Sequence, residues 1–267
     1  PLEDIKTEAA LLGDHGYREV VLTGINLPAY GKDLGLHLCN AVEAACAAPG
    51  IARVRLGSLE PEQLTPEVIA RMAKQEKLCP QFHLSLQSGC DATLKRMNRH
   101  YTTAEYRQIV HNLRQAFPNC AITTDIMVGF AGETEEEFAA SLAFAKEIAF
   151  AKVHVFAYST RAYDMPGQVT NKVKEERSRQ MIAATLATQR DFFAVQVGRV
   201  EEVLFEQERE KNVYEGYTRN YTPVRAASAT PLQGQVLPVE ITQALEDCCL
   251  GRLVWRAPRP LRAGKDG

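Results

Sequence analysis

The chain has 267 residues, of which 45% are hydrophobic and 24% charged, and its formal net charge is −2. These values are ordinary for a soluble globular protein, and they exclude a strongly basic nucleic-acid binder. No run approaches the roughly 18 apolar residues of a membrane span, and the opening PLEDIKTEAA lacks the regions of a signal peptide, so no membrane partner is expected.

The cysteine pattern indicates a reducing compartment. Seven cysteines are an odd number at wide spacings, which suits free thiols in the cytoplasm better than a disulfide framework. The vicinal Cys248 and Cys249 could bind a soft metal, but one thiol inside and one outside a strand is the favoured interpretation. The seven cysteines are Cys39, Cys46, Cys79, Cys90, Cys120, Cys248 and Cys249.

In chain order, the first part of the sequence alternates between helices and strands. The apolar periodicity predicts helices over 2–16, 34–50, 65–75, 103–117 and 132–150. It predicts strands over 18–26, 53–61, 81–89, 121–130 and 151–159. This alternation predicts a parallel α/β sheet, curved or barrel-like, in a domain over 1–197. Five strands cannot close an eight-stranded barrel, so either the sheet is open or an upstream strand is missing.

After a long amphipathic helix over 174–198, the pattern changes to short β segments. Turn residues separate these segments, and no helical period is present. The pattern predicts a separate small all-β barrel over 198–257. The end of the chain, 258–267, is rich in Pro, Gly and Arg and is predicted to be disordered.

Each predicted strand of the first part ends in small or polar residues. The carboxyl ends of parallel strands meet at one rim, where α/β folds bind ligands. A single polar strand end is usually a loop or a helix cap, but five together predict a binding site. A carboxylate such as Asp125 or Glu60 suits a ribose diol or an ammonium group. The candidate residues are Asn26, Ser58, Glu60, Gln87, Ser88, Asp125 and Ser159.

Tyrosines and arginines are interleaved in the second part, in the stretch YEGYTRNYTPVR. Aromatic rings that stack on bases, beside arginines that bind phosphate, are typical of an RNA-binding surface. A β-hairpin with core tyrosines explains the same residues, and composition alone does not separate the two interpretations. The candidate RNA-binding residues are Tyr214, Tyr217, Arg219, Tyr221 and Arg225.

Four motifs in sequential order carry a family resemblance: VVLTGINLPAYG, FHLSLQSGCDATLKRMNRHYT, TTDIMVGFAGETEEEF and VHVFAYSTR. They closely resemble the radical S-adenosylmethionine (SAM) methylthiotransferases. The nearest branch looks like the bacterial tRNA enzymes that methylthiolate C2 of N6-threonylcarbamoyladenosine beside the anticodon. The resemblance implies an incomplete (β/α)6-type barrel that lacks its first strand, followed by a small RNA-binding barrel of the TRAM type. It also implies SAM at the strand-end rim and the tRNA anticodon stem-loop as partner.

Members of the family also hold [4Fe-4S] clusters, one of them on a C-x3-C-x2-C motif of the first barrel strand, and an electron donor serves this cluster. None of the seven cysteines matches a cluster position, so no metal ligand is expected in this chain. We therefore expect the chain to be N-terminally truncated and inactive alone. Two alternatives remain open. One is a catalytically silent tRNA-binding fragment, and the other is an unrelated α/β-barrel enzyme with Asp125 and Glu60 as acid and base.

Overall fold

The structure is a computed structural model that describes residues 1–24, 27–159 and 165–254. The helices of the first part are α1 (Leu2–Asp14), α2 (Leu38–Ala47), α3 (Pro66–Met72), α4 (Asp91–Arg96), α5 (Thr103–Ala116), α6 (Glu135–Ile148) and α7 (Asn171–Ala194). The strands are β1 (Glu19–Leu22), β2 (Arg53–Leu56), β3 (Ser58–Leu59), β4 (Gln81–Leu84), β5 (Ala121–Val128) and β6 (Lys152–Ala157). The predicted alternation is confirmed, although α4 was missed and the elements are shorter than predicted. No helix in the described part of the chain is long and apolar enough to cross a membrane.

The strands of the first part are parallel and form a two-stranded sheet and a four-stranded sheet. β1 pairs with β2, and β3, β4, β5 and β6 pair in that order. Only Gly57 separates β2 from β3, and an isolated bridge from Val54 to Leu78 extends the pairing of β2 toward β4. Among the described residues, β1 and β6 each pair on one side, so the sheet does not close. The predicted parallel α/β sheet is confirmed, and a missing first strand stays a prediction.

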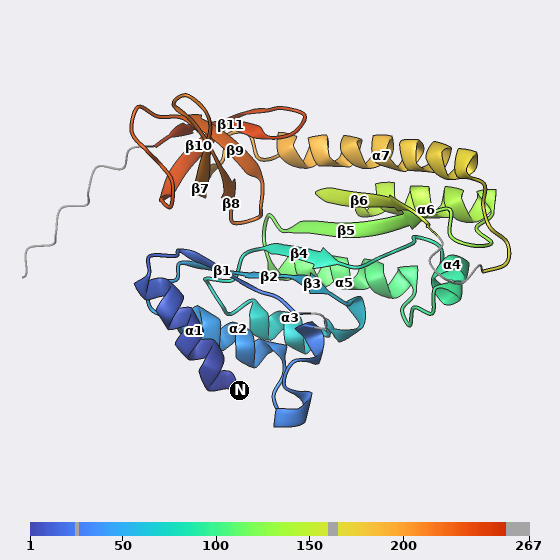
Figure 1. Ribbon diagram of the computed structural model, residues 1–267, viewed down its shortest axis with the longest axis horizontal. Coiled ribbons are helices and arrows are strands. Elements are labelled where there is room, and N and C mark those ends of the chain that lie inside the picture. Colours follow the sequence, from blue (N-terminus) through green and yellow to red (C-terminus); the bar gives the residue numbers. More distant parts are fainter. Residues whose placement is uncertain (25–26, 160–164, 255–267) are drawn as a thin grey trace, which may run out of the picture.

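The two-residue alternation of β5 gives the sheet two different faces. Ile122, Ile126 and Val128 belong to the hydrophobic core, which lies between the sheet and the helices. Thr123 and Asp125 alternate with them and therefore lie on the opposite face. Figure 1 shows α1, α2, α3 and α5 along one side of β1 to β4, and α6 and α7 beside β5 and β6. We call the opposite side the open face, and its polar residues are Ser58, Gln81, His83, Thr123, Asp125, Lys152 and His154.

The second part is a closed five-stranded barrel. Its strands are β7 (Val200–Glu210), β8 (Val213–Thr218), β9 (Pro223–Ala227), β10 (Val236–Ala244) and β11 (Cys249–Leu253). Alternate side chains fill its interior, with Phe193 from the end of α7 completing the core. The predicted small β-barrel is confirmed. The proposed boundary at 197/198 falls in the turn between α7 and β7, whereas the tail predicted to be disordered, 258–267, lies outside the described residues.

The small barrel docks against the amino ends of the sheet strands. α7 carries the chain back from the carboxyl ends of the strands to this side, as Figure 1 shows. Arg53 of β2 donates from Nη1 to the carbonyl oxygen of Tyr217 at 2.9 Å and from Nη2 to that of Glu202. Asn220 donates to the carbonyl oxygen of Asn119 at 3.1 Å, just before β5. The carboxyl ends of the strands, where the ligand site is predicted, therefore lie away from the barrel.

Removal of the Arg53 side chain tests this docking. Arg53 is 1% exposed, so Arg53→Ala leaves buried carbonyl groups without their charged donor. We expect the free energy of unfolding to fall by about 2–4 kcal/mol in urea denaturation. The control is Arg252→Ala, because Arg252 is 75% exposed and pairs with Glu240 at the surface. The control is expected to lose less than about 1 kcal/mol, and equal losses in both variants would contradict the docking role.

Candidate functional site

The open face brings polar side chains from neighbouring strands into rows. Parallel pairing aligns Ser58 with His83, His83 with Thr123, and Thr123 with Lys152. The next row toward the carboxyl ends pairs Asp125 with His154. A parallel sheet covered on both faces would have apolar residues at these positions. The alternating polar residues therefore indicate a face that is built to meet solvent or a ligand.

Asp125 is the most accessible carboxylate of this face near the strand centres. Its side chain is 31% exposed and lies away from the helical layer. One carboxylate oxygen, Oδ2, lies 3.4 Å from Nε2 of His83, which is longer than a normal hydrogen bond. The carboxylate thus has acceptor capacity left for the two hydroxyl groups of a ribose diol. The chemistry of this group fits the adenosine half of SAM.

Gln87 is tied to β5 beside Asp125. Its backbone N–H donates to the carbonyl oxygen of Asp125 at 2.9 Å, and its own carbonyl accepts from the N–H of Met127 at 2.9 Å. Its φ of 66° is unusual for a residue other than glycine and is typical of a functional turn. The structure therefore places Gln87 and Asp125 together at the carboxyl end of the sheet.

The remaining candidates of the rim differ in accessibility. Ser58 and Ser159 are exposed, and Ser159 lies two residues beyond Ala157, the last residue of β6. Glu60 is occupied by an ion pair with Arg99 at 3.2 Å. Asn26 lies outside the described residues. The geometry places Gln87 beside Asp125 and aligns Ser58 with His83, and the ligand contacts of all these residues stay predictions.

Ser88 and Gly89 have structural tasks in the turn after β4. Ser88 is fully buried, and its Oγ accepts from the backbone N–H of Cys90 at 3.3 Å. A Cβ at Gly89 would lie 2.7 Å from Cβ of Phe144 on α6, so this close approach requires glycine. The Gly89 N–H donates to Oγ of Ser141 at 2.9 Å. A ligand contact through the side chain of Ser88 stays a prediction, but this geometry does not favour it.

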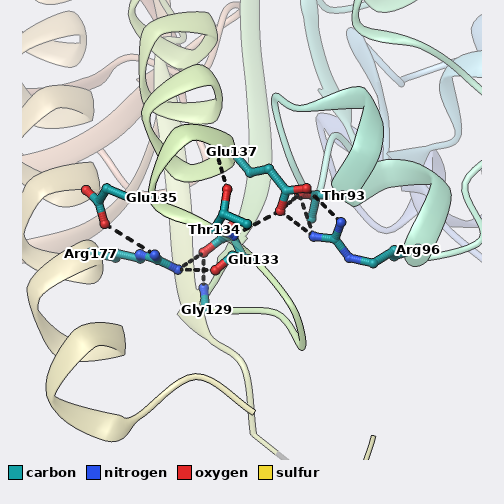
Figure 2. A network of polar contacts seen from close by, with 8 residues as sticks. All are labelled: Thr93, Arg96, Gly129, Glu133, Thr134, Glu135, Glu137 and Arg177. Atoms are coloured by element: carbon teal, nitrogen blue, oxygen red, sulfur yellow. Dashed lines mark hydrogen bonds and ion pairs between the residues drawn. The ribbon is translucent and has the colours of Figure 1, made fainter. Parts of the chain in front are cut away.

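The loop that follows β5 is fixed by a buried ion pair, shown in Figure 2. The Glu133 carboxylate accepts from the Gly129 N–H at 2.7 Å and from Nη1 of Arg177 at 2.8 Å. The Arg177 side chain is 6% exposed and that of Glu133 is 1% exposed. Because Arg177 belongs to α7, this pair ties the carboxyl end of β5 to the helix that leads to the small barrel. Gly129 is required here, because a Cβ would lie 2.5 Å from Cγ of Lys174.

A second ion pair in Figure 2 fixes the start of α6. Glu137 is the third helical residue after the N-cap Thr134 and completes a capping box with it. The same carboxylate binds Arg96 of α4, at 2.7 Å from Nη1. The hydrogen bonds from Arg96 hold the pKa of Glu137 below its usual value, so the carboxylate stays charged at neutral pH. The turn at 87–89, α4 and the loop after β5 thus stabilise one another.

The cysteines do not assemble into a metal site in the described part of the chain. All seven are free thiols, and all except Cys90 are buried. Burial raises the pKa of Cys120 to about 12, so its thiol stays protonated at neutral pH. No three His, Cys, Asp or Glu side chains of the described residues gather closely enough to hold a metal ion. These side chains therefore do not fit an iron–sulfur cluster.

The candidate RNA-binding residues divide into core, interface and surface positions. Tyr214 is 4% exposed and packs in the barrel core, as the core-tyrosine interpretation expects. Tyr217 and Tyr221 stack with ring centroids 4.5 Å apart, and Tyr221 is 46% exposed. Arg219 donates to the carbonyl oxygen of Leu78 at 3.0 Å and thereby joins the two domains.

Arg225 is held between two carboxylates. Its Nε donates to Glu215 at 2.8 Å and its Nη2 to Asp247 at 2.9 Å. With Tyr217 and Tyr221 it lines a cavity of about 270 Å³ between the sheet and the barrel. A role of these residues in RNA binding stays a prediction. This cavity is where three of them, Tyr217, Tyr221 and Arg225, lie together.

The radical SAM superfamily sequence model matches residues 1–145, more than half of the chain. The chain belongs to the radical SAM superfamily. Solved structures agree with this fold: coproporphyrinogen III oxidase (HemN) from Escherichia coli superposes with a TM-score of 0.54 at 11% identity, covering 82% of this chain and 59% of that one. The methyltransferase TsrM from Kitasatospora setae gives 0.51 at 12% identity, covering 70% of this chain and 46% of that one. At these identities the likeness concerns the fold alone.

Curated relatives are much closer in sequence. The chain is 35% identical over 252 residues to the threonylcarbamoyladenosine tRNA methylthiotransferase MtaB of Bacillus subtilis, covering 91% of this chain and 56% of that protein. It is 35% identical over 251 residues to the tRNA-2-methylthio-N(6)-dimethylallyladenosine synthase of Pelotomaculum thermopropionicum, with the same coverage of 91% and 56%. The chain thus spans about half the length of the curated relatives that it matches.

Sequence reasoning missed His83 and Thr123, which lie on the open face with Asp125. The signal was present: Thr123 and Asp125 alternate with the buried Ile122, Thr124 and Ile126 in β5, and Gln81 and His83 alternate with Phe82 and Leu84 in β4. The candidate residues were taken from the carboxyl ends of the predicted strands, and His83 and Thr123 lie within their strands.

Arg177→Ala tests the buried pair in Figure 2. Loss of the guanidinium leaves Glu133 as a buried carboxylate without its cation, and we expect a loss of about 3–5 kcal/mol in the free energy of unfolding. Arg179→Ala is the matched control on the same helix, because Arg179 is 75% exposed in its pair with Glu176. The control should change stability by less than about 1 kcal/mol in the same thermal or urea unfolding experiment. A loss for Arg177→Ala no larger than that of the control would show that the pair does not hold the loop.

Proposed function

We propose that this chain is the SAM-binding and RNA-binding part of a tRNA methylthiotransferase. The reaction proposed for the full-length protein is methylthiolation at C2 of N6-threonylcarbamoyladenosine next to the anticodon. The observation that carries the proposal is 35% identity over 252 residues to an enzyme named for this substrate, on the superfamily's fold. Relatives named for dimethylallyladenosine match equally well. The identity therefore supports the methylthiotransferase reaction, whereas the choice of threonylcarbamoyladenosine as substrate depends on the motifs in the sequence.

The open face supplies the proposed SAM site. Asp125 would accept from the ribose hydroxyls, and Gln87 would donate to and accept from the amino-acid moiety. Ser58, aligned with His83, adds a hydroxyl group at the same rim. SAM supplies the radical chemistry of the superfamily once an iron–sulfur cluster reduces it. Because the described cysteines do not fit such a cluster, we expect no catalysis from the 267-residue chain alone.

The proposed partners are the tRNA anticodon stem-loop and an electron donor for the cluster of the full-length protein. The exposed Tyr221 and the cavity at the domain junction support contact with RNA. The seven free cysteines support a cytoplasmic location. A catalytically silent tRNA-binding fragment is the alternative, and it predicts stem-loop binding without binding of SAM.

Asp125→Ala tests the ligand site. Loss of a charge-assisted hydrogen bond is expected to weaken binding of S-adenosylhomocysteine about ten- to a hundredfold by calorimetry. Asp191→Ala is the control, because Asp191 is exposed and lies near the end of α7 that leads into the small barrel. Circular dichroism of both variants should match the wild type. Unchanged affinity in Asp125→Ala would remove this residue from the site.

The substrate is tested in a protein extended to the full length of the relatives, with its clusters reconstituted. It is incubated with tRNA that carries threonylcarbamoyladenosine and, separately, with tRNA that carries dimethylallyladenosine. We expect the methylthio group, detected by mass spectrometry of the nucleosides, in the first tRNA at least tenfold above the second. Product in the dimethylallyl tRNA alone would make the substrate assignment wrong while leaving the reaction class intact.

A further inference from the structure

A chain of polar contacts crosses the open face from the domain junction to Asp125. Nη1 of Arg55 donates to Oε1 of Gln81 at 3.4 Å, and Nε2 of Gln81 donates to Oγ1 of Thr123 at 3.2 Å. Oγ1 of Thr123 lies 3.1 Å from Nδ1 of His83. On the other side of the same ring, Nε2 of His83 lies 3.4 Å from Oδ2 of Asp125.

The donor and acceptor roles along this chain follow from its first member. A guanidinium group only donates, so Gln81 must turn its carbonyl oxygen to Arg55 and its NH2 group to Thr123. The Thr123 hydroxyl then accepts from Gln81, and its single proton is free to be donated to Nδ1 of His83. A neutral imidazole that accepts at Nδ1 carries its proton on Nε2. That proton lies on the side of the ring that faces Asp125, whose Oδ2 is 3.4 Å from Nε2 and therefore not within a normal hydrogen bond.

The orientation of Arg55 is itself fixed. Its Nε and Nη2 bind the Glu19 carboxylate at 2.8 and 3.1 Å, and its Nη1 also donates to the carbonyl oxygen of Arg219 at 3.1 Å. The guanidinium carbon lies 4.6 Å from the centre of the Tyr221 ring. Both domains therefore hold the group that starts the chain.

Burial protects the chain from competition with water. Gln81 and Thr123 are 7% and 9% exposed, and the His83 side chain is 15% exposed. The charged and titratable groups of the described open face that lie across the sheet from His83 are Asp125 on β5 and, on β6, Lys152 in the same row and His154. The two imidazole centroids lie 6.2 Å apart. Away from water a hydrogen bond is stronger. The Nδ1–H tautomer of His83 would leave the Thr123 hydroxyl without an acceptor for its proton on this side.

We propose that His83 is a positioning residue for Asp125 in binding of the adenosine ribose. The proposal rests on the function proposed above for Asp125. In the free protein Nε2 of His83 lies 3.4 Å from Oδ2, and we expect this contact to shorten to a hydrogen bond when the ribose binds, which fixes the plane of the carboxylate. The other oxygen, Oδ1, is then presented to the two hydroxyls of the diol. The hydrogen bond from Thr123 keeps His83 in the required tautomer.

The test combines a spectroscopic readout with ligand binding, on the complete chain. The 15N shifts of the imidazole nitrogens are expected to show the Nε2–H tautomer of His83 in the wild type. Thr123→Val keeps the shape of the side chain but removes the proton donor, and we expect a mixture of tautomers and about threefold weaker binding of S-adenosylhomocysteine. Thr188→Val is the matched control, because the Thr188 hydroxyl donates only to its own helix, to the Thr185 carbonyl oxygen at 2.9 Å.

Two variants of His83 separate positioning from packing. His83→Ala is expected to weaken binding of S-adenosylhomocysteine about tenfold, whereas His83→Gln should stay within about threefold, because its amide can donate to Asp125. An Nδ1–H tautomer in the wild type, or full affinity in His83→Ala, overturns the proposal. If Asp125→Ala binds as tightly as the wild type, or if the wild type does not bind, the proposed site itself fails. If Asp125→Ala weakens binding and His83→Ala does not, only the positioning role fails.

Discussion

The guanidinium group of Arg55 contacts both halves of the molecule and begins the series of polar contacts across the open face. It lies on β2 near the amino ends of the sheet strands and is 4% exposed, so its charge must be matched by contacts within the protein. Glu19 supplies the opposite charge, and the Arg219 carbonyl and the Tyr221 ring supply contacts from the small barrel. Without the barrel, Arg55 would keep its ion pair with Glu19 but would lose the carbonyl acceptor and the aromatic ring that the barrel supplies. The docking of the barrel and the order of the open face therefore depend on one another.

This arrangement separates the two ends of the sheet by task. The amino ends carry the small barrel, whereas the carboxyl ends carry Asp125, Gln87 and the loop that the Glu133–Arg177 pair fixes. α7 connects the two ends, because Arg177 near its start binds the loop after β5 and Phe193 near its end fills the barrel core. Because α7 is anchored at both ends, it holds the barrel and the strand-end rim at a fixed distance and orientation. Such a relation is what an enzyme needs if RNA bound at one end must present a base at the other.

Much of the fold could be predicted from the sequence, because periodicity reports local geometry. The alternation of helices and strands, the parallel sheet and the change to a β-barrel all followed from apolar spacing and turn residues. The tasks of individual polar residues were harder to predict, because they depend on tertiary contacts. Arg219 beside Tyr221 has the composition of an RNA-binding surface, but the guanidinium of Arg219 binds backbone carbonyls of the sheet domain. Ser88 has the position of a ligand contact, but its hydroxyl is buried in its own turn.

The same limit explains why Asp125 was found and His83 was not. A carboxylate in an apolar strand is conspicuous, since an isolated buried charge is strongly unfavourable and demands a partner or a ligand. A histidine in a strand has several ordinary explanations, and only the three-dimensional order of Gln81, Thr123 and His83 shows which one applies. Because that order begins at Arg55, which also contacts Tyr221 of the small barrel, the domain junction and the surroundings of Asp125 share one series of polar side-chain contacts.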